Sequence, residues 1–268
     1  MSLISTFSRR QAAALCALLI ATPTWAAVRS TATAAAGPMT VQVFDMRPDD
    51  AVAAGVTFAN AAAGAAVSTT VEETRPYDHL WHARTGSWQE TSVDAVASHT
   101  EAYAAIAEGG STGPVGATMH LSGSTRDFDG SSYAAQAAML ENGQWLSFSL
   151  TPWSAMSLNV DVSGTLETLQ PGDHAEIVFE LTLSTSTGME RFDTFWMACD
   201  GACIDSNGRM LSVTLPNESD MALDGLWTLS ARVAGSSVAS AVPEASSSAL
   251  LMSGLALMGF VARRRTRP

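Results

Sequence analysis

The feature that most constrains the fold is a strict alternation of apolar and polar positions over residues 175–183. The apolar positions are Ile177, Phe179, Leu181 and Leu183. Because successive side chains of a strand point to opposite faces, this pattern predicts a β-strand with one buried face. The same alternation recurs over 156–162, 211–215 and 227–233.

Further short strands are predicted over 40–45, 55–59, 67–72, 117–122, 133–140, 145–150 and 191–197. Between 133–140 and 145–150, an Asn-Gly pair favours the positive φ angles of a tight hairpin turn. The apolar spacing over 93–108 fits either a helix or a strand and leaves both open. Many short strands separated by turns predict an all-β fold, an antiparallel β-sandwich of jelly-roll type over 39–235.

Two segments of simple composition flank this domain. Residues 27–38 are rich in Ala and Thr and end in Gly-Pro, which predicts a flexible leader. Residues 236–241 are predicted to form a linker. The chain contains no lysine, and 26 acidic residues outweigh its 14 arginines. Its acidic surface disfavours nucleic-acid binding, because it repels phosphate backbones.

The N-terminus has the features of a secretory signal peptide. Arg9 and Arg10 precede an apolar stretch over 12–21, and small residues surround the position after Ala26. Residues 1–26 are therefore predicted to be removed on export. Removal takes away Cys16 and leaves Cys199 and Cys203, which are predicted to form a disulfide that closes a small local loop.

The C-terminus combines three features in order. Val242, Pro243 and Glu244 come first, an apolar run over 249–262 follows, and Arg263, Arg264 and Arg265 come next. The run has 14 residues, fewer than the about 20 that span a bilayer as a helix. Arginines beyond it favour a cytoplasmic location for that end.

This arrangement resembles the PEP-CTERM sorting signal of Gram-negative bacteria, although Ala245 stands where a second proline is usual. The resemblance implies recognition by a membrane-embedded exosortase, with a transient stay of the 242–268 segment in the inner membrane. It also implies cleavage near Pro243-Glu244, and release or re-anchoring at the cell surface. Exosortase systems accompany extracellular polysaccharide production, so a role in the surface matrix or biofilm is expected.

Two acidic segments have the Asp/Asn/Gly composition of calcium loops. Asp127 and Asp129 lie in the first, and Asp205 and Asn207 lie in the second. Both lack the downstream glutamate of an EF-hand, and ordinary turns have the same composition. Calcium is thus the one cofactor considered, and no metal site is assigned.

The tryptophans divide into two groups. Trp145, Trp196 and Trp227 lie in predicted strands and are expected in the core. A second group lies in predicted loops or beside a proline, where exposed indole rings could stack on sugars: Trp81, Trp88 and Trp153.

No catalytic residue is assigned. Residues 109–113 match the G-x-S-x-G pattern around Ser111, but Pro114 follows and no strand and helix flank it, so a loop is predicted. His79 and His82 are predicted to lie in a surface loop.

The sequence favours a non-enzymatic protein of the cell surface or extracellular matrix that an exosortase processes. The alternative is a carbohydrate-binding module that uses the loop tryptophans, with or without calcium. A secreted hydrolase is the lesser alternative and rests on Ser111 and the histidines.

Overall fold

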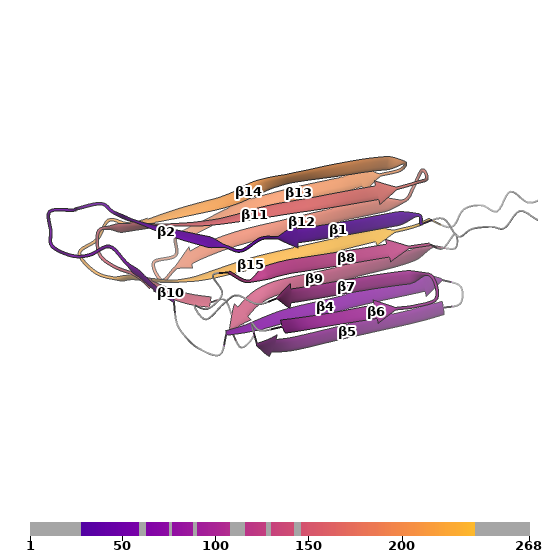
Figure 1. The fold of residues 1–268 in the computed structure, drawn as a ribbon, viewed down its shortest axis with the longest axis horizontal. Coiled ribbons are helices and arrows are strands. Elements are labelled where there is room, and N and C mark those ends of the chain that lie inside the picture. Colours follow the sequence, from indigo (N-terminus) through magenta and orange to yellow (C-terminus); the bar gives the residue numbers. More distant parts are fainter. Residues whose placement is uncertain are drawn as a thin grey trace, which may run out of the picture.

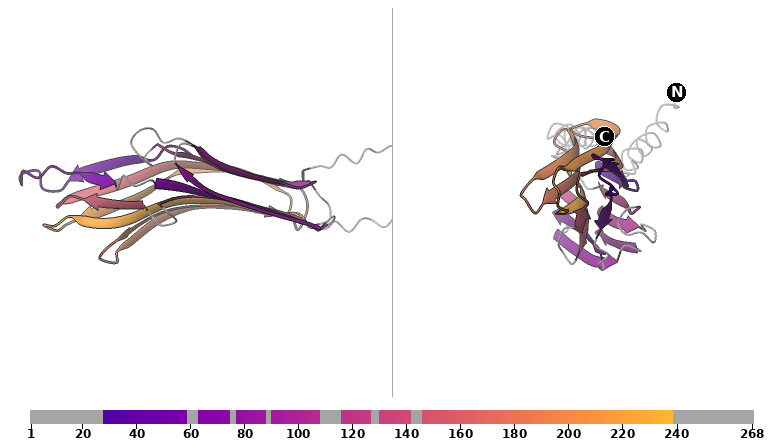
Figure 2. Two further views of the ribbon diagram at one scale, coloured as in Figure 1. Left: turned by 90° about the horizontal axis from the view of Figure 1, so that it is seen from below. Right: turned by 90° about the vertical axis from the view of Figure 1, so that its left-hand side faces the viewer.

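The protein is an all-β sandwich. The computed structural model describes residues 28–58, 63–74, 77–87, 90–107, 116–126, 130–141 and 146–238. Two antiparallel sheets pack face to face and run the length of the domain (Figure 1, Figure 2). The predicted fold class, an antiparallel sandwich, is confirmed.

The first sheet has seven strands. In spatial order they are β14 (Cys203–Asn217), β11 (Ser154–Thr168), β1 (Ser30–Ala36), β8 (Thr118–Thr125), β7 (Thr100–Ala107) and β6 (Glu90–Val96), with β2 (Thr40–Asp45) also paired to β11. Residues 93–107, whose apolar spacing fits either a helix or a strand, lie in the β6–β7 hairpin.

The second sheet has eight strands. In spatial order they are β13 (Glu190–Asp200), β12 (His174–Thr185), β15 (Leu223–Ser236), β9 (Ser131–Glu141), β4 (Ala63–Thr74) and β5 (Tyr77–Ser87), with β10 (Leu146–Leu150) paired to β15 and to β3 (Val56–Phe58).

The core lies between the two sheets and follows the alternation in the sequence. Ile177, Phe179, Leu181 and Leu183 of β12 are fully buried, as predicted. Trp227, on the neighbouring strand β15, is also fully buried. Burying one such side chain stabilises the fold by about 1.5–3 kcal/mol, so the core-facing row of β12 is a large part of the driving force.

The predicted leader over 27–38 is wrong, because most of it forms β1 in the middle of the first sheet. β1 pairs with β11 on one side and with β8 on the other. Ala32, Ala34 and Ala36 are buried. Their small side chains face the other sheet, so a segment whose composition looks structureless contributes to the core. Residues 28–38 therefore belong to the folded domain.

The predicted Asn-Gly hairpin is also wrong. β9 and β10 both run antiparallel to β15, so they point in the same direction and lie end to end along it. Ala138 lies opposite Ser230, and Leu146 lies opposite Trp227. β15 is 14 residues long and pairs with both segments, so long-range pairing overrides the local turn preference. Residues 142–145 lie outside the described chain.

Side chains cross between the sheets at both long edges of the sandwich. On one edge, Arg209 of β14 donates to the carbonyl oxygen of Thr194 in β13, and Asp193 accepts from the backbone N–H of Ser212 at 2.9 Å. On the other edge, His82 Nδ1 of β5 is hydrogen-bonded to the carbonyl oxygen of Asp94 in β6. These contacts occupy backbone groups that an exposed edge would otherwise offer to another strand.

Candidate functional site

Both ends of the domain meet at one end of the sandwich. β1 starts there, opposite the end of β11, and β15 finishes there, opposite the start of β12 (Figure 1). We call this the proximal end, and the opposite end, which carries the loop over 46–55, the distal end.

A buried ion pair joins two distant parts of the chain at the proximal end. Arg29 directly precedes β1, and Asp173 directly precedes β12. Arg29 Nε donates to Asp173 Oδ2 at 3.0 Å, and Arg29 Nη2 donates to Asp173 Oδ1 at 2.7 Å. Both side chains are 1% exposed or less. This two-bond geometry between guanidinium and carboxylate is strong and fixes the orientation of both groups.

The same pair holds the end of the described chain. Asp173 Oδ1 accepts from the backbone N–H of Val238 at 3.2 Å, and Arg29 Nη2 donates to the carbonyl oxygen of Val238 at 3.3 Å. Asp173 Oδ2 also accepts from the N–H of Gln170 at 3.1 Å. Arg29, Asp173 and Val238 therefore form a terminal clasp that ties the entry and the exit of the domain to one carboxylate.

Buried hydroxyl groups surround the clasp. Ser30 Oγ donates to the carbonyl oxygen of His174 at 2.7 Å. Ser237 donates its N–H to the carbonyl oxygen of Ser131 at 2.8 Å, and its Oγ accepts from the N–H of Ser131 at 3.3 Å. Residues 236–238, predicted as part of a linker, thus belong to the folded domain.

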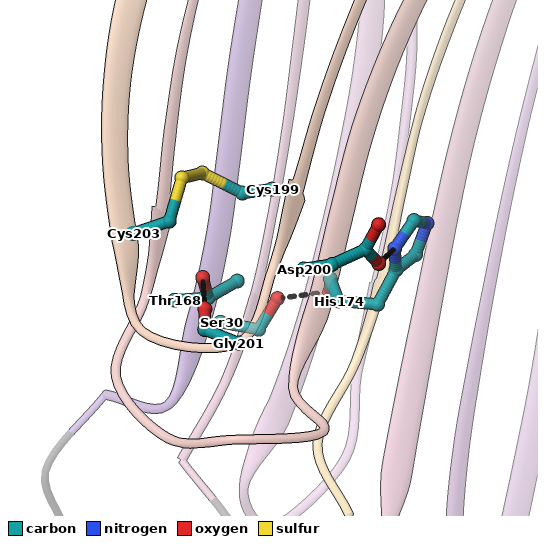
Figure 3. The surroundings of a disulfide bond; sticks show 7 residues. All are labelled: Ser30, Thr168, His174, Cys199, Asp200, Gly201 and Cys203. Atoms are coloured by element: carbon teal, nitrogen blue, oxygen red, sulfur yellow. Dashed lines mark hydrogen bonds and ion pairs between the residues drawn. A yellow bond between two sulfur atoms is a disulfide. The ribbon is translucent and has the colours of Figure 1, made fainter.

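The predicted disulfide is present at the proximal end, near Thr168 and Gly201 (Figure 3). Cys199 and Cys203 close the turn between β13 and β14, with their Cα atoms 5.7 Å apart. Within this turn, Gly201 donates its N–H to the carbonyl oxygen of Asp173 at 2.8 Å, and its own carbonyl oxygen accepts from Thr168 Oγ1. The disulfide therefore supports a turn that is hydrogen-bonded to the backbone of Asp173, the residue that supplies the clasp carboxylate.

Tyr133 fills the space between the sheets next to the clasp. A Cβ atom on Gly123 would lie 2.0 Å from its ring, and one on Gly235 would lie 2.4 Å from its hydroxyl oxygen. The hydroxyl group is 3.4 Å from Ser30 Oγ. Burial raises the pKa of Tyr133 well above its usual range, and the hydrogen bond with Ser30 opposes this shift.

The calcium hypothesis gains no support from the second acidic segment. Asp205 and Asn207 lie within strand β14, not in the predicted loop, because β14 pairs with β11 along its whole length. Asn207 Oδ1 accepts from the N–H of Gly208. Across the described residues, no three His, Cys, Asp or Glu side chains are grouped to hold a metal ion. Asp127 and Asp129 lie outside the described part of the chain.

The tryptophans differ in part from the prediction. Trp227 is buried as expected, but Trp196 is 65% exposed because it points outward from β13. Trp81 lies in β5 and is 62% exposed. At the distal end, Arg47 covers one face of the Trp153 ring with its guanidinium carbon 3.2 Å from the ring centroid, and Trp153 Nε1 donates to Asp220 Oδ1 at 2.6 Å.

Trp153 is therefore held by contacts with Arg47 and Asp220, and of the two predicted glycan contacts that the structure describes, Trp81 is the more exposed. Trp88 and Trp145 lie outside the described residues.

The two histidines considered for hydrolysis do not lie on one face of their strand. His79 and His82 lie on strand β5, not in the predicted loop, and residues three apart on a strand point to opposite faces. Residues 109–113, with Ser111, lie outside the described chain.

Sequence reasoning missed the clasp. Arg29 and Asp173 are 144 positions apart, and no motif links them. The available signal was a single arginine in an Ala/Thr-rich segment, together with the Pro-Gly-Asp turn at 171–173. Neither indicates a partner without knowledge of the strand order.

Comparison with known proteins identifies the segment that follows the clasp. A family model described as the PEP-CTERM protein-sorting motif matches residues 241–265. These include Val242, Pro243, Glu244 and Arg263 to Arg265, all outside the described residues. No curated protein matches the chain. Over the described residues, none of the elements is a helix of the length and apolarity needed to cross a membrane. The chain thus carries a PEP-CTERM sorting signal, which identifies an exported protein that is sorted by an exosortase to the cell surface or the extracellular space.

Proposed function

We propose that this chain is a non-catalytic protein of the surface matrix of a Gram-negative bacterium, displayed as a β-sandwich and contributing to a biofilm or polysaccharide layer. The observation that carries the proposal is the position of the terminal clasp. It fixes Val238, which lies three positions before the matched sorting motif.

The clasp limits the reach of the processing site. Pro243 follows Val238 by five residues, which span at most about 17 Å when fully extended. An exosortase that cuts near Pro243-Glu244 therefore works close to the proximal end. The start of the domain, which follows the signal peptide, and the start of the tail both lie at that end. The distal end is therefore directed away from the membrane.

The acidic composition supports a location outside the cell. A net charge of −12 without any lysine keeps copies of the protein apart at high local concentration. No catalytic role is proposed. The G-x-S-x-G match at 109–113 follows strand β7, but strand β8 begins at Thr118, too soon after Ser111 for the helix that this motif needs.

Intact mass and cell fractionation test the proposal in a host with and without its exosortase. We expect loss of residues 1–26 in both hosts, and cleavage near Pro243 with surface or extracellular location only when exosortase is present. A tail that stays intact in the exosortase-positive host contradicts the proposal.

A carbohydrate-binding module is the second candidate. The observation that favours it is the exposed Trp81 ring on the outer face of the second sheet. Glycan arrays with and without calcium, on the parent protein and Trp81→Ala, test this candidate. Equal binding by both proteins excludes Trp81 as the contact. A secreted hydrolase is the lesser candidate, and unchanged hydrolysis in Ser111→Ala and His79→Ala removes its basis.

A further inference from the structure

A groove of about 470 Å³ lies on the outer face of the second sheet, at the distal end. β12, β15, β10 and β3 lie side by side there. Its volume is within the range of about 300–1,000 Å³ that small-molecule sites occupy. We call it the serine groove, after the side chains that line it.

The outward side chains of the groove form two rows across the strands. In one row, Leu226 of β15 lies between Ser184 of β12 and Ser147 of β10. In the other row, Asp224 lies opposite Ser149, and Ser149 lies opposite Thr57. Directly opposite side chains in such rows are about 4.5–5.5 Å apart at Cβ. A single apolar side chain is therefore surrounded by hydroxyl groups and one carboxylate.

Local packing holds the strands beneath the groove close together. A Cβ atom at Gly225 would lie 2.4 Å from the Phe148 ring and 2.6 Å from the carbonyl oxygen of Ser184, so β15 sits close to its neighbours only because this residue is glycine. Ser186 donates its N–H to the carbonyl oxygen of Asp224 at 2.9 Å and holds the end of β12 against β15. The outward residues around Leu226 are small, so they leave space above it.

The chemistry of the lining selects the class of ligand. Serine and threonine hydroxyls both donate and accept hydrogen bonds, and a carboxylate accepts two from adjacent hydroxyl groups. Leu226 is 43% exposed and offers an apolar surface between them. A pyranose ring has this combination of an apolar face and a rim of hydroxyls. None of the residues that line the groove is basic, so no positive charge would offset the repulsion between an anionic ligand and Asp224.

We propose that the serine groove binds one neutral sugar unit. Asp224 and Ser149 accept and donate hydrogen bonds at one edge of the sugar, Ser147 and Ser184 do so at another, and Leu226 packs against the ring. This inference rests on the carbohydrate-binding candidate above and places the contact at a site other than the tryptophans. The groove lies at the distal end, away from the clasp and the tail.

Isothermal titration calorimetry of the full-length chain in mild detergent tests the inference. The probes are glucose, galactose, mannose and N-acetylglucosamine, each up to about 50 mM, with glucuronate as the anionic probe. We expect a millimolar dissociation constant for at least one neutral sugar and weaker binding of glucuronate. Asp224→Asn keeps the shape of the groove but removes a charged acceptor, so the affinity for the neutral sugar should fall by about tenfold. The difference in affinity between that sugar and glucuronate should also become smaller.

Ser147→Phe fills the groove and should abolish binding. Its matched control is Ser68→Phe, a half-buried serine of β4 on the same outer face but outside the groove. Thermal unfolding verifies that each variant is folded. Absence of binding by every neutral sugar overturns the inference, and so does binding that neither Ser147→Phe nor Asp224→Asn alters. Both results leave the sorting proposal standing, because fractionation tests that separately.

Discussion

The proximal and distal ends of the sandwich are stabilised in different ways. At the proximal end, Arg29 and Asp173 are buried next to hydroxyl groups and are hydrogen-bonded to each other. At the distal end, the core consists of large apolar side chains such as Leu150, Met156 and Trp227. Apolar packing tolerates changes of similar volume, whereas a buried ion pair has one arrangement. The end that carries the tail is thus the end with the more specific geometry.

The largest effect in this comparison is expected for Asp173→Ala. It leaves the Arg29 guanidinium buried without its carboxylate and should lower the free energy of unfolding by about 3–5 kcal/mol, measured by urea denaturation. The double variant Arg29→Met/Asp173→Leu is the control, because it removes both charges and should recover at least half of the loss. A single variant as stable as the parent would show that the clasp has no such role.

A distal variant of similar severity separates stability from processing. Leu150 is fully buried, and Leu150→Ala should cost about 2–5 kcal/mol through lost burial and the cavity that remains. We expect its folded fraction to be cleaved near Pro243 as in the parent, whereas Asp173→Ala should alter the efficiency of cleavage. Equal processing of the two variants at equal folded fraction would mean that the clasp does not present the tail.

The contact between Tyr133 and Gly123 gives a smaller expected effect. Gly123→Ala places a methyl group against the Tyr133 ring, and overpacking of this kind costs about 1–3 kcal/mol. The change should be visible as a lower melting temperature. Combining it with Tyr133→Leu should relieve the clash, so that the two losses are less than additive.

The pH dependence provides the finest comparison. The unfolded chain releases the phenolic proton of Tyr133 near pH 10.0, whereas the folded protein keeps it because burial raises the pKa. The contribution of Tyr133 to the free energy of unfolding is therefore fully present below pH 10. Above pH 10 it falls by about 1.4 kcal/mol per pH unit. Tyr133→Phe should lack this slope between pH 10 and 11. Lysine titration cannot mask the result, because the chain has no lysine.

The parts of the fold that were predictable are those where large apolar residues alternate. The strand over 174–185 and its buried face follow from the sequence alone. Prediction failed where the decisive partner is remote. β1 looks like a leader until β8 and β11 flank its alanines, and the Asn-Gly pair suggests a turn until β15 pairs with both neighbouring strands. Trp196 follows the strand period but lies on the outer face of an edge strand.

The candidate sites show the same limit. The disulfide joins residues four positions apart, so spacing was sufficient to predict it. The clasp and the serine groove combine residues from three or more strands or turns. Their side chains are common in any exported domain, and only the strand order brings them together.

The central place of β15 has a mechanical consequence. This strand leads directly to Val238 and is hydrogen-bonded along most of its length to β12 on one side and to β9 and β10 on the other. Tension applied through the tail acts along the strand, across the direction of these hydrogen bonds. The bonds therefore share the load in shear instead of opening one after another. A force applied at the C-terminus would therefore be resisted by all the hydrogen bonds of β15 together.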